Sequence, residues 1–364
     1  MIRNRNLFYL SLCWCFVCCS PDKPIVEGIP PETEAEQPLP PGWLVQPEDI
    51  IDGGPGKDGI RAIDRPLFVD AEEAAFLSED ELVLGVNIGN DARAYPHRIL
   101  DFHELVNDIV GEQPITVTFA PLTGSGLAWS RRIKETVTTF GSSGLLYHHN
   151  LIPYDRATES FWSQMRLDCV NGAQFGHSLQ QIPIVETTWK TWRKMFPTTK
   201  ILTVIDPFHQ NYNGKRYTIY KNDPDYFLYP IDEFIKRLPS KERVFGVVVK
   251  GKARVFGFNF IARKPDNLVV YNEEWNGEPV VFAAHAARNF MVAYGRRLAD
   301  GTVLEFTAVP SGNEIILKDQ EGSRWNILGE AVSGARIGEQ LPLLQSHVAY
   351  WFAWSLFYPG CRVN

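Results

Sequence analysis

Positive charge is scarce in this sequence, and long apolar runs are absent beyond one short stretch at its start. The 364 residues include 36 Lys and Arg against 43 Asp and Glu, which gives a formal net charge of −7 at pH 7. No basic stripe is present that could neutralise a phosphate backbone, so nucleic acid is not an expected partner. Apolar residues make up 45% of the chain, enough to bury the core of one large domain or two ordinary ones.

The one apolar stretch follows two arginines and is about a dozen residues long, "LFYLSLCWCFVCCS". It is too short to span a bilayer comfortably and is typical of the central part of a signal peptide. Cys19 closes the stretch in the manner of a bacterial lipoprotein signal, in which that cysteine is lipidated. We therefore expect residues 1–19 to be a lipoprotein-type signal, with ordinary secretion and an uncleaved anchor as alternatives. The expected location is the cell envelope, on a membrane, through an N-terminal lipid.

Cysteine is rare after this stretch, where only Cys169 and Cys361 remain. In an oxidising compartment these two thiols could pair and tie distant parts of the chain together. Two separate free thiols are the alternative, because the sequence does not fix the distance between them. Residues 20–56 are rich in proline and acidic side chains, which predicts a linker without a core of its own.

Several blocks of sequence recur in the same order about 160 residues apart. "LVLGVNIGNDARAYP" at 82–96 lines up with "RVFGVVVKGKARVFG" at 243–257, and each reads as a hairpin with alternating apolar positions. Further along, Trp162 corresponds to Trp325. The endings "ETTWKTWRKMFP" and "VAYWFAWSLFYP" also correspond, and their spacing predicts a helix stopped by proline, with the Trp residues in the core.

From these matches we predict a β-rich α+β fold of two pseudo-symmetric tandem repeats, each made of strands and hairpins and closed by a Trp-containing helix. The first repeat covers 57–205, a connection covers 206–240, and the second repeat covers 241–364. A short helix is expected over 231–238, at the end of the connection.

The folded part also resembles a known family. The stretches "GGPGKDGIRAIDRPLFV", "ARAYPHRILDFHELVND", "VTFAPLTGSGLAW", "FGSSGLLYHHNLIPYDRATESFWSQ" and "WNILGEAVSG" resemble the domain-of-unknown-function family numbered 3179. The resemblance runs from about residue 53 to about residue 360. It implies an exported bacterial or archaeal protein, and it implies location and architecture more than a reaction.

One departure from that family affects the expected chemistry. The family motif at 118–124 commonly carries cysteine at the positions of Ala120 and Thr123, where a Cys-x-x-Cys pair would suggest metal or redox chemistry. Both cysteines are absent here. Either this chain has lost that chemistry, or the cysteines were never its centre.

The stretch "FHELVND" at 102–108 supplies the first candidate site. On the helix expected there, His103 and Asn107 share one face, and Glu104 and Asp108 share another. The matching stretch "KPDNLVVYNEEW" has no histidine. His103 and Glu104 are therefore candidate catalytic residues and candidate ligands of a divalent metal, with a purely structural polar helix as the alternative.

A second group of polar residues lies further along. In "LLYHHNLIPYD" the run Leu145–Tyr147 reads as a strand, and His148, His149 and Asn150 follow it. Because adjacent side chains of a strand point to opposite faces, at most one of the two histidines is expected to face inward with His103. Asn150 and Asp155 are typical of the family pattern. "PLTGSG" at 121–126 is a glycine-rich turn that contains Thr123 and lacks the lysine of a phosphate loop. Together with Asn107 and Asp108, these residues are candidates for ligand binding.

Three functions follow from the sequence. The first is an envelope lipoprotein with a small-ligand or metal-binding pocket in the first repeat, built around His103, Glu104 and Asn150. The second is a hydrolase or metal-dependent enzyme that uses His103. The third is a structural or interaction protein of the envelope. Its partner, whether a small molecule or a protein, is not indicated by the residues.

Overall fold

The computed structural model describes residues 42–203, 212, 216–231, 234, 236–263, 268–310 and 313–364. The chain divides into two units, Met1–Pro38 and Leu39–Asn364, and every element below belongs to the second. The expected signal sequence, with Cys19, and most of the expected linker lie outside the described residues. No helix in the described ranges is long and apolar enough to cross a membrane.

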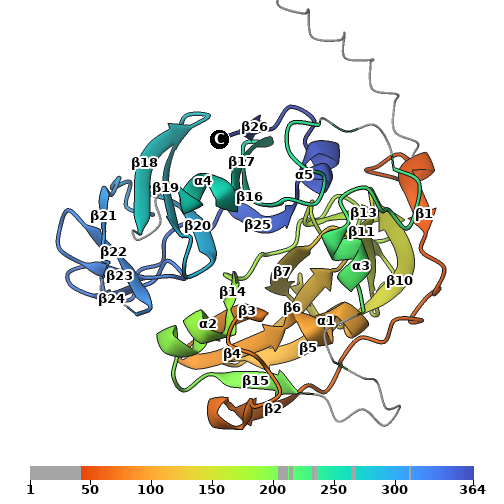
Figure 1. Cartoon of the computed structure of the whole chain (residues 1–364), viewed down its shortest axis with the longest axis horizontal. Helices are drawn as coiled ribbons and strands as arrows, with labels where there is room; N and C mark the ends of the chain where they lie inside the picture. Colours follow the sequence, from red (N-terminus) through yellow and green to blue (C-terminus); the bar gives the residue numbers. More distant parts are fainter. Residues whose placement is uncertain are drawn as a thin grey trace, which may run out of the picture. The chain divides into compact units, whose positions relative to one another are not determined.

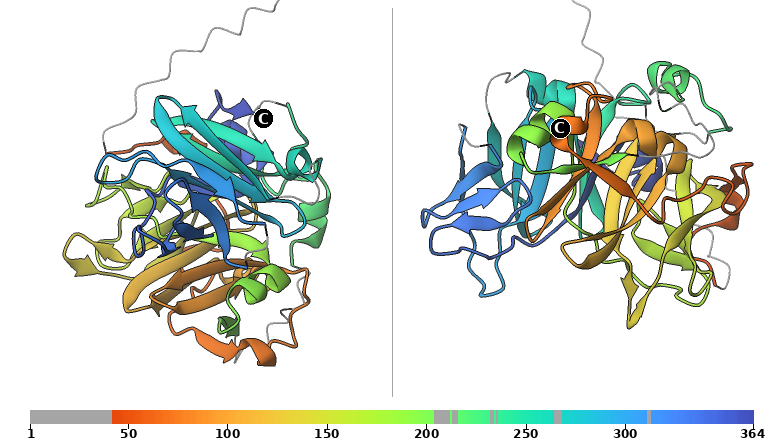
Figure 2. Two further views of the ribbon diagram at one scale, coloured as in Figure 1. Left: turned by 90° about the vertical axis from the view of Figure 1, so that its left-hand side faces the viewer. Right: turned by 90° about the horizontal axis from the view of Figure 1, so that it is seen from below.

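The body consists of small, mostly antiparallel sheets that form a ring, a six-bladed β-propeller arrangement (Figures 1 and 2). We number the blades in chain order. Blade 1 contains β2 (Leu67–Asp70), β3 (Leu82–Ile88), β4 (Asp91–Pro96), β14 (Val185–Thr188) and β15 (Lys200–Thr203), and blade 2 contains β5 (Leu105–Val110), β6 (Gln113–Ala120) and β7 (Ser125–Ser130). Blade 3 contains β1 (Ile50–Asp52), β10 (Phe140–Tyr147), β11 (Asn150–Asp155), β12 (Phe161–Ser163) and β13 (Asp168–Asn171), and blade 4 contains β16 (Arg243–Val249), β17 (Lys252–Gly257), β25 (Gln345–Tyr350) and β26 (Arg362–Val363). Blade 5 contains β18 (Val269–Trp275), β19 (Glu278–His285) and β20 (Phe290–Gly295), and blade 6 contains β21 (Phe306–Ala308), β22 (Ile315–Asp319), β23 (Arg324–Asn326) and β24 (Ala331–Ser333).

Short helices connect or cover these sheets. They are the α-helices α1 (His97–His103), α2 (Trp189–Met195), α3 (Thr218–Asn222), α4 (Phe258–Ala262) and α5 (Trp351–Phe357), and the 3-10 turns η1 (Pro47–Asp49) and η2 (Ala71–Glu73). A two-stranded ribbon, β8 (Arg132–Ile133) with β9 (Thr136–Val137), projects between blades 2 and 3 in the chain order. Strand β1 falls inside the range predicted as linker and pairs with β10. The helix expected over 231–238 lies partly outside the described residues, and its described positions are not helical.

The hydrophobic core lies between neighbouring blades rather than within one half of the chain. One cluster joins blades 1 and 2, a second joins blades 2 and 3, a third joins blades 3 and 4, and a fourth joins blades 4 and 5. The largest cluster brings Val83 of blade 1 together with Phe290 of blade 5 and Trp325 of blade 6. Burial of apolar surface therefore closes the ring.

The prediction of two tandem repeats is wrong. The chain is one ring, and the core between blades 1, 5 and 6 crosses the predicted boundary, so neither half buries its apolar residues alone. The sequence matches fall between blades that are three apart in chain order. Blades 1 and 4 share a strand order, β14-β3-β4-β15 in one and β25-β16-β17-β26 in the other, and Trp162 of blade 3 corresponds to Trp325 of blade 6. The unit that repeats in space is the blade, a sheet too small to hold a core without neighbours.

Local predictions within these blades are confirmed. The hairpins β3–β4 and β16–β17 form with the expected pairing, and the turn residues Gly89 and Asn90 have φ of 56° and 70°, as a two-residue hairpin turn requires. Trp192 is fully buried in α2. A Cβ on Gly85 would lie 2.3 Å from its ring, so the glycine makes room for the indole. Cys169 and Cys361 are buried free thiols.

Candidate functional site

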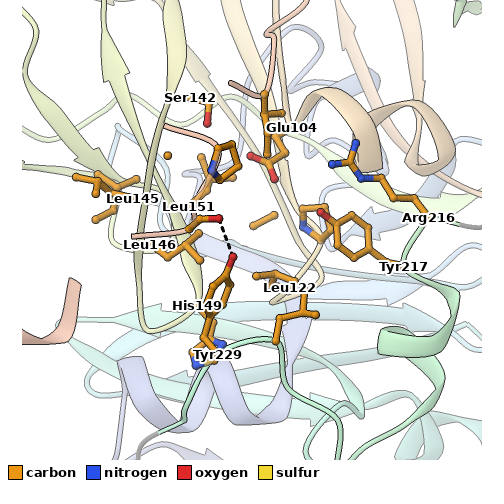
Figure 3. Close-up of a pocket in the computed structure, with 18 residues that line it drawn as sticks. Glu104, Leu122, Ser142, Leu145, Leu146, His149, Leu151, Arg216, Tyr217 and Tyr229 are labelled. Carbon is orange, nitrogen blue, oxygen red and sulfur yellow. Dashed lines mark hydrogen bonds between the residues drawn. The ribbon is translucent and has the colours of Figure 1, made fainter. Parts of the chain in front are cut away.

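A cavity of about 230 Å³ opens between blades 2 and 3 and the chain segment that precedes blade 4 (Figure 3). Most of its lining residues have apolar side chains, and polar and apolar atoms contribute about equally to its exposed wall. The lining residues are Gly53, Pro55, Ile60, Glu104, Ala120, Pro121, Leu122, Ser142, Gly144, Leu145, Leu146, His149, Leu151, Ile152, Arg216, Tyr217, Leu228 and Tyr229. An apolar cavity with a few convergent polar groups is the usual form of a small-molecule site.

The outer wall, from Arg216 to Tyr229, is fixed to the ring by buried polar contacts. The Tyr220 hydroxyl donates to the carbonyl of Leu122 at 2.8 Å. The Lys221 ammonium pairs with the buried Asp101 carboxylate at 2.6 Å. The Lys241 ammonium donates to backbone carbonyls of this segment and lies 3.5 Å from the centre of the Tyr220 ring, and burial lowers its pKa to about 8. The wall is therefore held in place without any ligand.

Glu104 is the acidic residue of the cavity, and its backbone is unusual. It follows the last residue of α1 with φ 58° and ψ −32°, a conformation that residues other than glycine rarely adopt. Its N–H donates to the Leu100 carbonyl at 2.8 Å, and its carbonyl accepts from the Phe119 N–H at 2.8 Å. The junction between α1 and β5 therefore holds Glu104 in a strained conformation, a feature that is common at functional sites.

The side chain of Glu104 points into the cavity, with Arg216 and Tyr217 to one side and Leu145 and Leu146 to the other (Figure 3). Within the described residues, its carboxylate accepts no hydrogen bond and has no ion-pair partner within 4 Å. Burial raises the pKa of Glu104 to about 7, and the positive charge of Arg216 offsets part of that rise. A carboxylate in this position can bind a hydrogen-bond donor or exchange a proton near neutral pH.

Arg216 and Tyr217 complete the polar side of the cavity. The Arg216 guanidinium is exposed and lies 4.9 Å from the centre of the Phe102 ring. Burial and the nearby Glu104 carboxylate raise the pKa of Tyr217, so its phenol stays protonated. On the opposite wall the Tyr229 hydroxyl donates to the Gly53 carbonyl at 2.7 Å. The cavity thus holds an acid inside and a cation at its edge.

The prediction of a helix over 102–108 is wrong. Helix α1 ends at His103, and Leu105–Val110 is the strand β5. The His103 ring does not line the cavity. Its Nδ1 lies 2.8 Å from the Arg61 carbonyl and its Nε2 lies 2.6 Å from the Tyr212 hydroxyl, which places an N–H on Nδ1 in the neutral ring. Both ring nitrogens are therefore engaged in protein contacts.

Asn107 and Asp108 lie in β5, away from the cavity. The Asn107 amide contacts the Asp64 carboxylate, the Thr116 hydroxyl and both backbone groups of Phe140 at 2.7–2.9 Å. In blade 5, Asn272 makes the same pair of backbone contacts with Phe306. Because this pair of side-chain to backbone hydrogen bonds occurs in both blades, we interpret it as a structural contact that joins adjacent sheets.

Asp108 is likewise committed to contacts within the fold. Its carboxylate accepts from the Arg93 guanidinium at 2.7 and 2.8 Å and from the Tyr95 hydroxyl at 2.7 Å. Asp155 binds the Trp162 indole N–H at 3.0 Å, as Asp319 binds that of Trp325 at 2.9 Å. These carboxylates are satisfied, and the second contact has a counterpart in blade 6.

Thr123 and Asn150 belong to one buried hydrogen-bond network beside the cavity. The Asn150 amide donates to the Thr123 hydroxyl at 2.9 Å, to the Ser125 hydroxyl at 3.0 Å and to the Gln164 side chain at 2.7 Å. All four side chains are buried. The network joins the β6–β7 turn to β11 and so fixes the strands that carry the cavity wall.

Strand β10 ends at Tyr147, as predicted, and His148 and His149 follow it. They form the two-residue turn between β10 and β11, with φ of 48° and 65°. His149 lines the cavity, and its Nε2 lies 2.9 Å from the Pro230 carbonyl. Within the described residues, no group of three His, Cys, Asp or Glu side chains is placed to hold a metal ion.

Ala120, one of the two positions where cysteine was considered, lines the cavity next to Pro121, whereas Thr123 is enclosed in the Asn150 network. Sequence analysis missed Ser142, Arg216, Tyr217 and Tyr229. A usable signal existed for Glu104 alone: it stands three positions before Asn107, and the residue three positions before the matching Asn272 is Val269.

No curated protein and no solved structure matches this chain. A family model does, over residues 57–361, which include all six blades except strands β1 and β26. The chain therefore belongs to the DUF3179 family, described as proteins of unknown function.

Proposed function

We propose that this protein binds a small, mostly apolar molecule through a hydrogen-bond donor that meets Glu104. The observation that carries the proposal is an unpartnered carboxylate, held by a strained backbone inside an apolar cavity. A partly buried acid without a partner costs stability, and a ligand that donates to it would offset that cost. Amines and hydroxyl compounds have the required donor, and the leucine-rich wall suits a hydrocarbon or aromatic portion.

The test uses benzylamine as the probe. Wild-type protein should bind benzylamine saturably in a calorimetric titration at pH 8, where the Glu104 carboxylate is charged. Binding should weaken as the pH falls through about 7, because the carboxylate then takes up a proton. Glu104→Gln should abolish binding, and the exposed Glu135→Gln should not. Equal affinity in wild type and Glu104→Gln would remove the cavity from consideration.

A second function is favoured by the pKa of Glu104. A carboxylic acid with a pKa of about 7 is suited to general acid–base catalysis, and this role falls to Glu104 rather than to His103. Turnover of p-nitrophenyl esters would reveal it as a rate that rises with a midpoint near pH 7 and is lost in Glu104→Gln. No turnover together with intact benzylamine binding would leave the binding function alone.

We also propose that the protein is exported and anchored to a membrane of the cell envelope by a lipid on Cys19. The support comes from the charged start, the short apolar run and the cysteine that ends it. Expressed in a bacterium with its own leader, the protein should enter the membrane fraction and incorporate labelled lipid. Cys19→Ala should stop both. Unchanged lipid labelling in that variant would refute the anchor.

A further inference from the structure

A second cavity, of about 190 Å³, lies at the edge of blade 4 and shares no lining residue with the Glu104 cavity. Strands β16 and β17, the end of β18 and the chain around β26 form its wall. Three basic side chains and one acidic side chain line it, together with the indole of Trp275; the charged residues are Lys252, Arg254, Arg362 and Glu274. Positive charge is therefore in excess around this cavity, although the net charge of the protein is negative.

Blade 1 provides the comparison, because Arg93 occupies the position in β4 that Arg254 occupies in β17. Each faces a valine of the preceding strand, Val86 in one hairpin and Val247 in the other. The Arg93 guanidinium is saturated by carboxylates: Asp91 accepts from Nε at 3.1 Å and from Nη2 at 2.8 Å, and Asp108 accepts from Nη1. No anion is needed there.

In blade 4 the first of these carboxylates is replaced by a cation. Lys252 begins β17 where Asp91 begins β4, each paired with the last residue of the strand before it. Arg254 keeps one acidic partner, Glu273, at 2.5 Å, and its Nη2 donates to the Asn364 side chain at 3.1 Å. Its Nε, which Asp91 would satisfy in blade 1, is buried and has no hydrogen-bond acceptor among the described residues.

The neighbouring charged residues provide no acceptor for the Arg254 Nε. Glu273 also accepts from the Trp275 indole at 2.8 Å, so its carboxylate is shared. Lys252 and Arg362 have no carboxylate within 4 Å in the described part of the chain. Arg362 pairs directly with Arg254 across β26 and β17, which brings two guanidinium-bearing residues together. Apart from Glu273, which Arg254 already engages, this group has no carboxylate acceptor among the described residues.

We infer that this cavity binds a small organic carboxylate whose apolar part lies against the Trp275 indole. The Lys252 ammonium and the Arg362 guanidinium, which line the cavity, supply charge-assisted donors for the carboxylate oxygens. The Arg254 guanidinium lies 4.8 Å from the centre of the Trp275 ring and Phe256 stacks on the same indole, so the hydrocarbon portion of a bound carboxylate meets the part of Trp275 that lines the cavity. One negative charge suits the site better than two, because Glu274 is also in the lining.

Sodium benzoate is the probe, titrated at low ionic strength into the whole protein by calorimetry. Wild type should bind it saturably, and inorganic phosphate should bind more weakly because it has no apolar part. Lys252→Asp restores to Arg254 the partner that Asp91 gives Arg93, so it should lower benzoate affinity at least about tenfold while keeping or raising the melting temperature. Lys252→Gln should give a smaller loss.

The charge-matched control is Lys318→Gln, which removes one exposed cation from blade 6. Its benzoate affinity should equal that of wild type. The inference is overturned if wild type shows no saturable benzoate binding, or if both Lys252 variants bind benzoate with unchanged affinity. Unchanged affinity in both variants is also the result expected if benzoate binds in the Glu104 cavity instead. Phosphate binding tighter than benzoate binding overturns the role of the Trp275 face.

Discussion

The stability of this protein should depend on pH through Glu104, and Glu104→Gln should reveal how strongly. Burial raises the pKa of Glu104 from the ordinary 4.5 to about 7 in the folded state. Below pH 4.5 both folded and unfolded chains carry the proton and nothing is lost. As the pH rises from 4.5 to 7, the unfolded chain releases its proton first, so the free energy of unfolding falls. Above pH 7 the loss is complete.

The size of the loss follows from the difference in pKa. Each pKa unit corresponds to about 1.4 kcal/mol, so the buried charge costs roughly 3 kcal/mol at pH 8. Glutamine has nearly the same shape and no charge. The variant should therefore be more stable than wild type by roughly 3 kcal/mol at pH 8, relative to whatever difference the two show at pH 4.

Urea unfolding at intervals from pH 4 to pH 8 measures this difference, because other titrating groups contribute equally to both proteins and cancel. Glu135→Gln, at an exposed position in the turn between β8 and β9, is the matched control and should give a constant difference from wild type. A difference between Glu104→Gln and wild type that does not change with pH would refute the reasoning. It would mean that Glu104 is solvated or is paired in the folded protein.

Two further changes test how the blades hold together. Asn107→Ala removes four hydrogen bonds, two of them to Phe140 in blade 3, and should cost about 3 kcal/mol in urea unfolding. Asn272→Ala removes two hydrogen bonds, both to Phe306 in blade 6, and should cost less; equal costs would contradict this difference in contacts. Gly85→Ala places a Cβ 2.3 Å from the Trp192 ring and should cost about 2–3 kcal/mol or more, which combination with Trp192→Leu should partly restore; a melting temperature unchanged by Gly85→Ala would show that the indole can move.

The sequence predicted local structure well where a short pattern determined it. The β3–β4 hairpin is an example, because its turn and its alternating apolar positions lie within fifteen residues. The strand β5 was misread as a helix, because Leu105, Val106 and Ile109 suit either period in so short a stretch. What decides the outcome is the pairing of β5 with β6, a contact that a local pattern does not contain.

The ring and the cavity depend on contacts between distant residues. Matches between two parts of a chain are compatible with two separate domains or with two places in one ring. Only the tertiary packing distinguishes them, here a single core cluster that contains both Val83 of blade 1 and Trp325 of blade 6. Glu104 was a candidate because it stands beside His103 in "FHELVND", and its matching position, Val269, is apolar. Arg216 and Tyr229 had no such signal, since they lie in a segment without a matched counterpart and reach the cavity only after the ring has closed.

Blades 1 and 4 are each completed by a strand made long after the first two. Val185 of β14 pairs with Gly85, and His347 of β25 pairs with Gly246, about a hundred residues apart in each case. During synthesis, the edge of each opening hairpin therefore stays unpaired while two further blades are made. Such an edge invites pairing with other chains, so folding should depend on chaperone protection. Removal of the last twenty residues should abolish blade 4, because β25, α5 and β26 all lie there.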